Sequence, residues 1–382
     1  MKRKIIFTVN TYFPLKDGVQ NVTQYHAEGL AAKGYDVIVI TPLYDNLKED
    51  EWHNNVFIKR INIKTSNSFY SGDKKFYLDT IMKETKDAHA LINVCMQTPT
   101  TDWIFQILDQ ISCKKILYVH GMFDFKWHRW DFMSIGTIAH KGWNGIRWGI
   151  YYSTIKKYLI KYDEIIQLHK FDLATLFFKE NYNISCKIIG NAADEEFFEK
   201  VESKNDKYAI SVANYMDRKN QIDTLRAFYK AEVQNEFGLV LIGSKKNAYY
   251  DQLIEEKEKL EEKYGHKSVQ ILTNISREKT ISYIKNASLY LMNSKWEAFP
   301  VSIVESMAAG IPYITTDVGC NKYLPGGIVV KNIEEMSYWI NLLEYNQEIS
   351  RAIGMAGSMY AMRYLTKESV INELEKVILN NE

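Results

Sequence analysis

Two glutamates in the C-terminal third of the sequence have a type and a spacing that could serve a ligand with hydrogen-bond donors at both ends. Glu297 and Glu305 stand eight positions apart in the stretch SKWEAFPVSIVESMAAGIPYITTD, with a Phe-Pro pair between them. Pro300 suits the first position of a helix, and Gly310 suits the position just after its end. We therefore expect a helix from about residue 300 to residue 309, with one glutamate before it and one inside it.

The start of this predicted helix can bind an anion. The backbone N–H groups of Phe299, Val301 and Ser302 precede the first hydrogen bonds of the helix, and the helix dipole adds positive charge there. Carboxylates accept hydrogen bonds from hydroxyl groups, so glutamates on either side of a bound diphosphate would contact a sugar and a ribose. A nucleotide sugar has this layout. From the residues alone, two exposed glutamates beside a structural helix remain an equal alternative.

The elements that would position these residues form an α/β pattern. Short apolar runs alternate with segments of helical period along most of the chain. The runs that we expect to be strands are IIFTV, DVIVIT, ALINV, KILYVH, EIIQL and CKIIG, followed by YAISVAN, GLVLIG, VQILTN, ASLYLMN and PYITT. Strands that alternate with helices predict parallel sheets covered on both faces. Such sheets bind ligands outside the carboxyl ends of their strands.

The alternation pauses once and then restarts, which predicts two domains. The pause is the acidic and polar segment NAADEEFFEKVESKNDK, residues 191–207. We expect a first domain over residues 1–192 and a second over residues 206–361. The chain after about residue 351 has a helical pattern with no strand signal, and the residues alone would let it cover either domain.

Composition excludes several classes of protein. The chain has 382 residues, 46% of them hydrophobic, and 48 basic against 47 acidic side chains, so no global field would attract nucleic acid. Four cysteines without metal-ligand spacing indicate a reducing compartment, and no apolar run has the length of a membrane span. The sequence contains neither a G-x-G-x-x-G nor a P-loop fingerprint, and no D-x-D pair that would hold a metal against a diphosphate.

The stretch EAFPVSIVE resembles the E-x7-E motif of group 1, or family 4, retaining glycosyltransferases of GT-B fold, and SMAAGIPYITTDVG resembles the segment that follows it. The resemblance implies two Rossmann-like, doubly wound domains that face a central cleft. It also implies that a C-terminal helix, about residues 362–382, crosses back to the first domain. The first domain would be the acceptor side and the second would bind the nucleotide-sugar donor.

Further segments resemble the same family in the same order. FPLKDGVQNVTQYH places Gly18 in the family's glycine turn, and YVHG places His120 at the histidine beside the acceptor. VANYMDRKNQIDTLRAF places Lys219 on the lysine that holds the donor diphosphate. The arginine expected five positions earlier is Asn214, and we expect the neighbouring Arg218 to supply the missing charge. IGNAADEEFF resembles the segment that enters the second domain.

The resemblance implies transfer of a sugar from a nucleoside diphosphate, with UDP expected first and GDP next, to an acceptor hydroxyl with retention of anomeric configuration. We expect Arg218, Lys219 and the backbone of Phe299, Val301 and Ser302 to hold the diphosphate in place of a metal ion. The resemblance also implies that Glu297 contacts the donor sugar and Glu305 the ribose. His120 would take part in catalysis, and Gly18 would let its turn approach the donor or the acceptor. No cofactor is expected. Assembly of a bacterial capsule, lipopolysaccharide or other surface polysaccharide is the commonest setting of such enzymes.

Residues 123–162 contain four of the eight tryptophans and seven Lys/Arg against two Asp. Basic and aromatic residues together suit a membrane interface, so we expect a cytoplasmic protein that can contact the inner face of the cytoplasmic membrane and take a glycan or lipid-linked sugar as acceptor. Core tryptophans beside solvated basic faces are the alternative for this segment. Two rival functions remain open: a nucleotide-sugar epimerase or hydrolase of the same fold, and a non-catalytic relative that binds glycans or serves as a scaffold.

Overall fold

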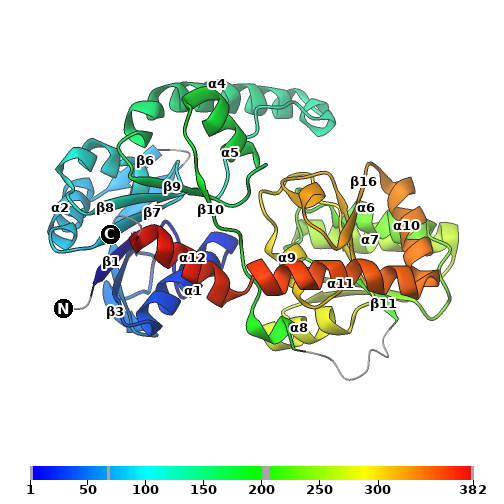
Figure 1. The fold of residues 1–382 in the computed structure, drawn as a ribbon. Helices are drawn as coiled ribbons and strands as arrows, with labels where there is room; N and C mark the ends of the chain where they lie inside the picture. Colours follow the sequence, from blue (N-terminus) through cyan, green and yellow to red (C-terminus); the bar gives the residue numbers. More distant parts are fainter. Residues whose placement is uncertain (1–2, 67–68, 200–206, 380–382) are drawn as a thin grey trace. The chain divides into compact units, whose positions relative to one another are not determined.

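The chain folds into two compact units, each built around its own sheet (Figure 1). The computed structural model describes residues 3–66, 69–199 and 207–379. The first unit comprises Met1–Ile189 and Ile371–Glu382, and the second comprises Gly190–Val370.

The first unit contains an eight-stranded sheet with the order β10-β9-β8-β7-β1-β2-β4-β3, which is parallel except for the edge strand β3. The strands are β1 (Lys4–Thr8), β2 (Asp36–Pro42), β3 (Asp50–His53), β4 (Val56–Ile61), β7 (Ala90–Val94), β8 (Lys114–Tyr118), β9 (Glu164–Gln167) and β10 (Lys187–Ile188). A separate antiparallel pair is formed by β5 (Ile63–Ser66) and β6 (Phe69–Gly72). The central strands are buried apolar runs, as the sequence predicts for a sheet covered on both faces.

Helices cover this sheet. They are α1 (Gly18–Ala32), α2 (Lys74–Thr85), α3 (Pro99–Asp102), α4 (Ile135–Leu159), α5 (Leu173–Phe177) and most of α12 (Lys367–Leu379). Asp17 caps α1 by accepting a hydrogen bond from Gln20 N at 2.8 Å, which explains why the helix starts at the glycine turn. Lys114 Nζ donates to the carbonyl of Val377 in α12, and this ties the end of the chain to the first unit.

The second unit contains a six-stranded parallel sheet with the order β13-β12-β11-β14-β15-β16. The strands are β11 (Tyr208–Val212), β12 (Gly238–Gly243), β13 (Val269–Thr273), β14 (Leu289–Met292), β15 (Tyr313–Thr316) and β16 (Gly327–Val330). The helices are α6 (Gln221–Lys230), α7 (Ala248–Tyr264), α8 (Arg277–Asn286), α9 (Val301–Ala308), α10 (Ile333–Tyr345) and α11 (Gln347–Tyr364). Counted within this unit, the strand order is 3-2-1-4-5-6, the doubly wound order of a Rossmann sheet.

The units differ at their edges from the expected domains. The first segment ends at Ile189 rather than at residue 192, because Asn191 and Asp194 bond within the second unit. The chain returns to the first unit at Ile371 rather than at about residue 362, since α11 packs on α9. Residue 206, the expected start of the second domain, and residues 380–382 of the expected final helix lie outside the described residues.

No helix in residues 3–66, 69–199 and 207–379 is both long enough and apolar enough to cross a membrane.

Candidate functional site

The second sheet has its switch point between β11 and β14, which lie side by side at its centre. From β11 the chain continues to β12 and β13 on one side of the sheet, and from β14 it continues to β15 and β16 on the other side. The loops that follow β11 and β14 therefore lead away in opposite directions. In open α/β sheets the ligand crevice opens outside the carboxyl ends of the strands at this point. These two loops carry Arg218 and Lys219 on one side and Glu297 on the other.

Lys219 and Glu297 meet at this switch point. Lys219 Nζ donates to Glu297 Oε1 at 2.5 Å, with side-chain exposures of 19% and 8%. Sequence reasoning proposed both residues separately, and the structure brings them together across 78 positions of chain. An ammonium group has three donors, so Lys219 can hold Glu297 and still donate to a bound anion.

Arg218 is directed differently from Lys219. Its guanidinium lies over the ring of Trp296, 5.4 Å from the ring centre. Its carbonyl accepts a hydrogen bond from Lys295 N at 2.8 Å, and Lys295 Nζ bonds Asp217 at 2.7 Å. These bonds join the loop after β11 to the loop after β14, next in sequence to the Lys219–Glu297 pair.

A third loop supports Glu297 from the neighbouring strand β15. Gly319 has a left-handed φ of +56°, and a Cβ there would collide with the carbonyl oxygen of Ala298. Cys320 N donates to that same carbonyl at 3.2 Å. Only glycine allows the loop to approach so closely, which explains the Val-Gly-Cys sequence after β15.

Helix α9 begins one residue later than the sequence suggests. Pro300 is the N-cap, with φ −71° and ψ 120°, and Val301 is the first helical residue. The correction has a physical reason: the first backbone bond of the helix runs from Ile303 N to the carbonyl of Pro300, which is the role of an N-cap residue. The N–H groups of Val301 and Ser302 remain at the positive end of the helix. The predicted end is confirmed, since α9 stops at Ala308 and Gly310 has φ +68°.

Glu305 is buried, with 4% of its surface exposed, and is held by a residue that sequence reasoning missed. Arg277 Nη2 donates to Glu305 Oε1 at 2.5 Å. Burial raises the pKa of Glu305, and the Arg277 charge opposes that rise. Arg277 is the first residue of α8, four positions after the end of β13, so its place at the carboxyl edge of the sheet was a signal in the sequence that was not used.

Arg277 also links Glu305 to the segment that enters the second unit. Its Nη2 donates to Asp194 Oδ2 at 2.5 Å, and Lys367 pairs with the other oxygen of Asp194 at 2.6 Å. The Asp194 pKa is lowered, because these two cations outweigh its burial. Asn191, from the same segment, donates to the carbonyl of Phe299 at 2.7 Å, just before α9. The residues that resemble the family's Asn-Gly-Val-Asp segment therefore support the start of α9 and Glu305.

The remaining predicted residues belong to the first unit. His120 follows β8, and its ring stacks on that of Tyr118 with centres 4.6 Å apart. Burial lowers the pKa of His120 to about 4, so its imidazole is neutral near pH 7. Gly18 is exposed at the first position of α1, and a Cβ there would meet no atom within 4 Å. Open space at Gly18 is compatible with close approach of a ligand to the backbone.

The described part of the first unit buries several polar atoms that lack a partner, and His26 and His120 both lie against the ring of Tyr118. His120 Nε2, both ring nitrogens of His26 and the Tyr12 hydroxyl have no hydrogen-bond partner among the described residues. Burial lowers the pKa of His26 to about 3, with a smaller contribution from His120. Sequence reasoning missed His26, which lies on the buried face of α1, because a lone histidine in a helix gives no functional signal.

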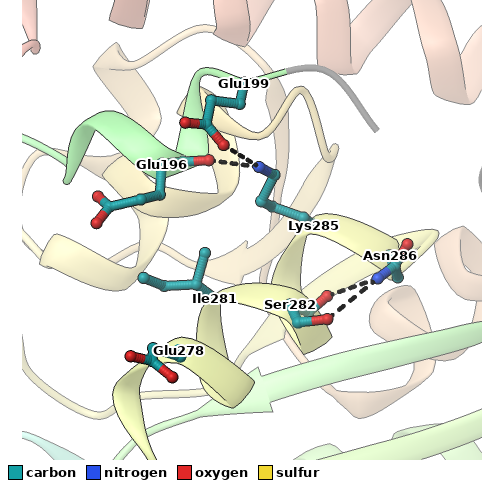
Figure 2. A pocket seen from close by; sticks show the side chains of 7 residues that line it. All are labelled: Glu196, Glu199, Glu278, Ile281, Ser282, Lys285 and Asn286. Atoms are coloured by element: carbon teal, nitrogen blue, oxygen red, sulfur yellow. Dashed lines mark hydrogen bonds and ion pairs between the residues drawn. The ribbon is translucent and has the colours of Figure 1, made fainter. Parts of the chain in front are cut away.

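A pocket of about 300 Å³ opens elsewhere on the second unit, between residues 195–199 and α8 (Figure 2). Lys285 projects between the two segments, where it donates to the Glu196 carbonyl at 2.5 Å and pairs with Glu199 at 3.5 Å. None of the predicted donor residues lines this pocket. Within the part of the chain that the structure describes, no three His, Cys, Asp or Glu side chains are grouped to hold a metal ion.

Comparisons with known proteins agree with this geometry. Residues 178–350 match the family model described as glycosyl transferases group 1. No curated protein sequence matches the chain. Several solved structures are similar over nearly the whole chain. Sucrose-phosphate synthase from Thermosynechococcus elongatus has a TM-score of 0.75 at 14% identity, covering 100% of this chain and 99% of that one. A glycosyltransferase from Rickettsia africae has a TM-score of 0.75 at 16% identity, with 100% of both chains covered.

The third similar structure is HepE from Anabaena, in complex with UDP and glucose. It has a TM-score of 0.70 at 12% identity, covering 99% of this chain and 100% of that one. At such low identities these likenesses show the fold, which is the GT-B fold. The segment that matches the group 1 glycosyl transferase model, residues 178–350, includes the switch point, the Lys219–Glu297 pair, Arg277 and α9, within a chain of GT-B fold.

Proposed function

We propose that the protein transfers a sugar from a nucleoside diphosphate to an acceptor hydroxyl, with retention at the anomeric carbon. The observation that carries this proposal is the Lys219–Glu297 pair, at 2.5 Å, at the switch point of the sheet within the segment that matches group 1 glycosyl transferases. A lone ion pair would be ordinary surface chemistry. This pair is largely buried and precedes a helix N-terminus. Lys219 supplies a cation, Glu297 accepts hydrogen bonds from hydroxyl groups, and the helix N-terminus can bind an anion.

The proposed reaction breaks the bond between the anomeric carbon and the diphosphate oxygen, and forms a bond from the same carbon to the acceptor oxygen. The electron pair of the broken bond stays on the diphosphate, which can take the acceptor proton. Lys219, with Arg218 nearby, and the N–H groups of Val301 and Ser302 would stabilise the charge on the leaving group. Glu297 would accept hydrogen bonds from sugar hydroxyls and Glu305 from the ribose. No metal ion is required in this scheme.

Two further assignments rest on the first unit. His120 would act as a neutral hydrogen-bonding group toward the transferred sugar or the acceptor. The acceptor would be a glycan or a lipid-linked sugar, in a cytoplasmic enzyme that contacts the membrane through residues 123–162 and serves surface-polysaccharide assembly.

UDP is the first donor to test, because the similar HepE structure is described as a complex with UDP and glucose. GDP is the second.

Donor binding can be tested by thermal shift, with UDP, GDP, ADP, CMP and dTDP each added in the presence of EDTA. A nucleotide at a hundred times its dissociation constant adds about 2.7 kcal/mol of stability, or about 5 to 10 °C for a unit of this size. We expect one nucleotide to give this shift and Glu305→Ala to weaken it. No shift with any of the five would refute the enzyme and favour the non-catalytic alternative.

A further inference from the structure

Helix α4 has an unusual distribution of apolar side chains. The residues that it buries, Tyr152, Ile155 and Leu159, all lie in its last third. Its first sixteen residues, 135–150, bury none. An ordinary surface helix turns its apolar side inward along its whole length, so the first part of α4 needs another explanation.

Four large apolar residues of this first part point outward, whereas Trp148 packs partly buried against the core. Ile135, Trp143, Ile146 and Ile150 are 87%, 68%, 62% and 61% exposed. At 3.6 residues per turn, these four positions fall within one quarter of the helix circumference. We call this set the α4 outer face. Single apolar residues scattered over a surface are normal, but four large ones on one stripe form a patch, and such patches mark interaction sites.

Glycines extend the open surface beside the α4 outer face. A Cβ built at Gly142, Gly145 or Gly149 meets no atom within 4 Å. Glycine is the poorest helix former after proline, and a helix this rich in it gains little stability from propensity in water. Figure 1 shows α4 as a long helix on the outside of the first unit. A surface that covers the α4 outer face would stabilise this helix.

The charge around the α4 outer face is positive, which favours an anionic partner. Between Phe132 and Tyr162 the sequence has five Lys/Arg and no Asp or Glu. Lys156 and Lys157 are exposed almost two turns beyond Ile150, and Lys157 lies in line with the outer face. Tryptophan and isoleucine bordered by lysine suit the boundary between lipid headgroups and acyl chains, where anionic lipids attract the cations.

We propose that the α4 outer face docks on a bilayer that contains anionic lipids, with α4 lying in the plane of the interface. Ile135, Trp143, Ile146 and Ile150 would enter the headgroup and acyl boundary, and Lys156 and Lys157 would contact lipid phosphates. This proposal names the contacting residues within the broad segment 123–162. It concerns lipid binding and holds whether or not the donor site transfers sugar.

The test uses the full-length protein, without nucleotide, in vesicle co-sedimentation. Vesicles of phosphatidylcholine with about 30% phosphatidylglycerol are compared with vesicles of phosphatidylcholine alone, at about 0.1 M salt, where the Debye length is about 10 Å. The variants are a triple change, Trp143→Ser with Ile146→Ser and Ile150→Ser, and a double change, Lys156→Ser with Lys157→Ser. The matched control is Met355→Ser with Met359→Ser on α11, whose side chains are 62% and 66% exposed in the second unit.

We expect the wild type and the α11 control to bind anionic vesicles at least about tenfold more tightly than neutral ones. The triple variant should lose binding to both kinds of vesicle, and the lysine variant should lose only the preference for anionic lipid. Equal binding by the triple variant and the wild type would overturn the proposal. A lipid-free dimer that the triple variant abolishes would also overturn it, and would assign the α4 outer face to a second copy of the chain.

Discussion

The contact between Arg277 and Glu305 makes a quantitative prediction, since it joins a half-exposed cation to a buried carboxylate. The Arg277 side chain is 46% exposed and that of Glu305 is 5% exposed. Replacing Arg277 with methionine keeps most of the side-chain volume and removes the charge. Glu305 then loses its partner, whereas Asp194 keeps Lys367 at 2.6 Å. The cost therefore arises mainly at Glu305.

The size of the loss follows from this burial. Removing one partner of a fully buried pair costs about 3 to 5 kcal/mol. Because water reaches almost half of Arg277, we expect a smaller loss for Arg277→Met, about 2 to 3 kcal/mol at pH 8. For a unit of this size, the melting temperature should fall by about 5 to 10 °C.

The loss should depend on pH. Burial already raises the pKa of Glu305, and without Arg277 it should rise further. A carboxyl whose pKa is higher in the folded than in the unfolded state stabilises the fold at low pH and loses that contribution as pH rises. The difference between the wild type and Arg277→Met should therefore be smaller at pH 5 than at pH 8.

Scanning calorimetry at both pH values measures this, with Arg226→Met as the matched control. Arg226 is 43% exposed and also pairs with two carboxylates, but its main partner, Glu256, is 18% exposed rather than 5%. We expect the control to lose no more than about 1 kcal/mol, with no pH dependence. Equal losses for Arg277→Met and Arg226→Met, or a loss that is the same at pH 5 and pH 8, would refute the reasoning.

Three further predictions concern single positions. Burial raises the pKa of Asp102 to about 6, so relative to Asp102→Asn the wild type should lose about 2 to 3 kcal/mol as pH rises from 4 to 7; parallel melting curves would contradict this. Gly354→Ala should lower the free energy of unfolding by about 1 to 3 kcal/mol, because its Cβ would collide with the Gly310 carbonyl. Gly145→Ala in α4 should raise it by up to about 1 kcal/mol, because its Cβ meets no atom. Denaturant unfolding that finds Gly354→Ala more stable than Gly145→Ala would be inconsistent with the packing. His120, whose pKa burial lowers to about 4, should show a neutral imidazole by ¹⁵N NMR down to about pH 5, and a titration midpoint near 6.5 would exclude the buried environment.

The sequence predicts the second unit better than the first. Its strands are apolar runs bounded by turn residues, and the five strands expected there, β11 to β15, are all present. In the first unit, β3, β4 and the pair β5 and β6 were not predicted. Polar residues interrupt the apolar pattern of these strands, so their pairing depends on tertiary contacts rather than on periodicity. The run CKIIG predicts a longer strand than β10, which pairs only at Lys187 and Ile188.

The candidate site could be predicted as a set of residues but not as a set of contacts. The E-x7-E spacing and the resemblance to the family indicated Glu297, Glu305 and Lys219. Which of them pair depends on strand order, because the switch point brings β11 next to β14. Arg277 has no motif of its own, and its role appears only once β13 and α8 place it against Glu305.

Lys219 is proposed to hold the donor diphosphate beside Glu297, which is proposed to hold the donor sugar, and calorimetric titration of UDP and UDP-glucose in EDTA tests this most directly. The variants are Lys219→Met and, as a control of similar exposure, Lys257→Met, in which the lost partner is Glu261 on α7. We expect wild type and Lys257→Met to bind alike and Lys219→Met to bind at least about tenfold more weakly, since a charge-assisted hydrogen bond contributes about 1.5 to 3 kcal/mol. Equal affinity of Lys219→Met and the wild type would contradict the account.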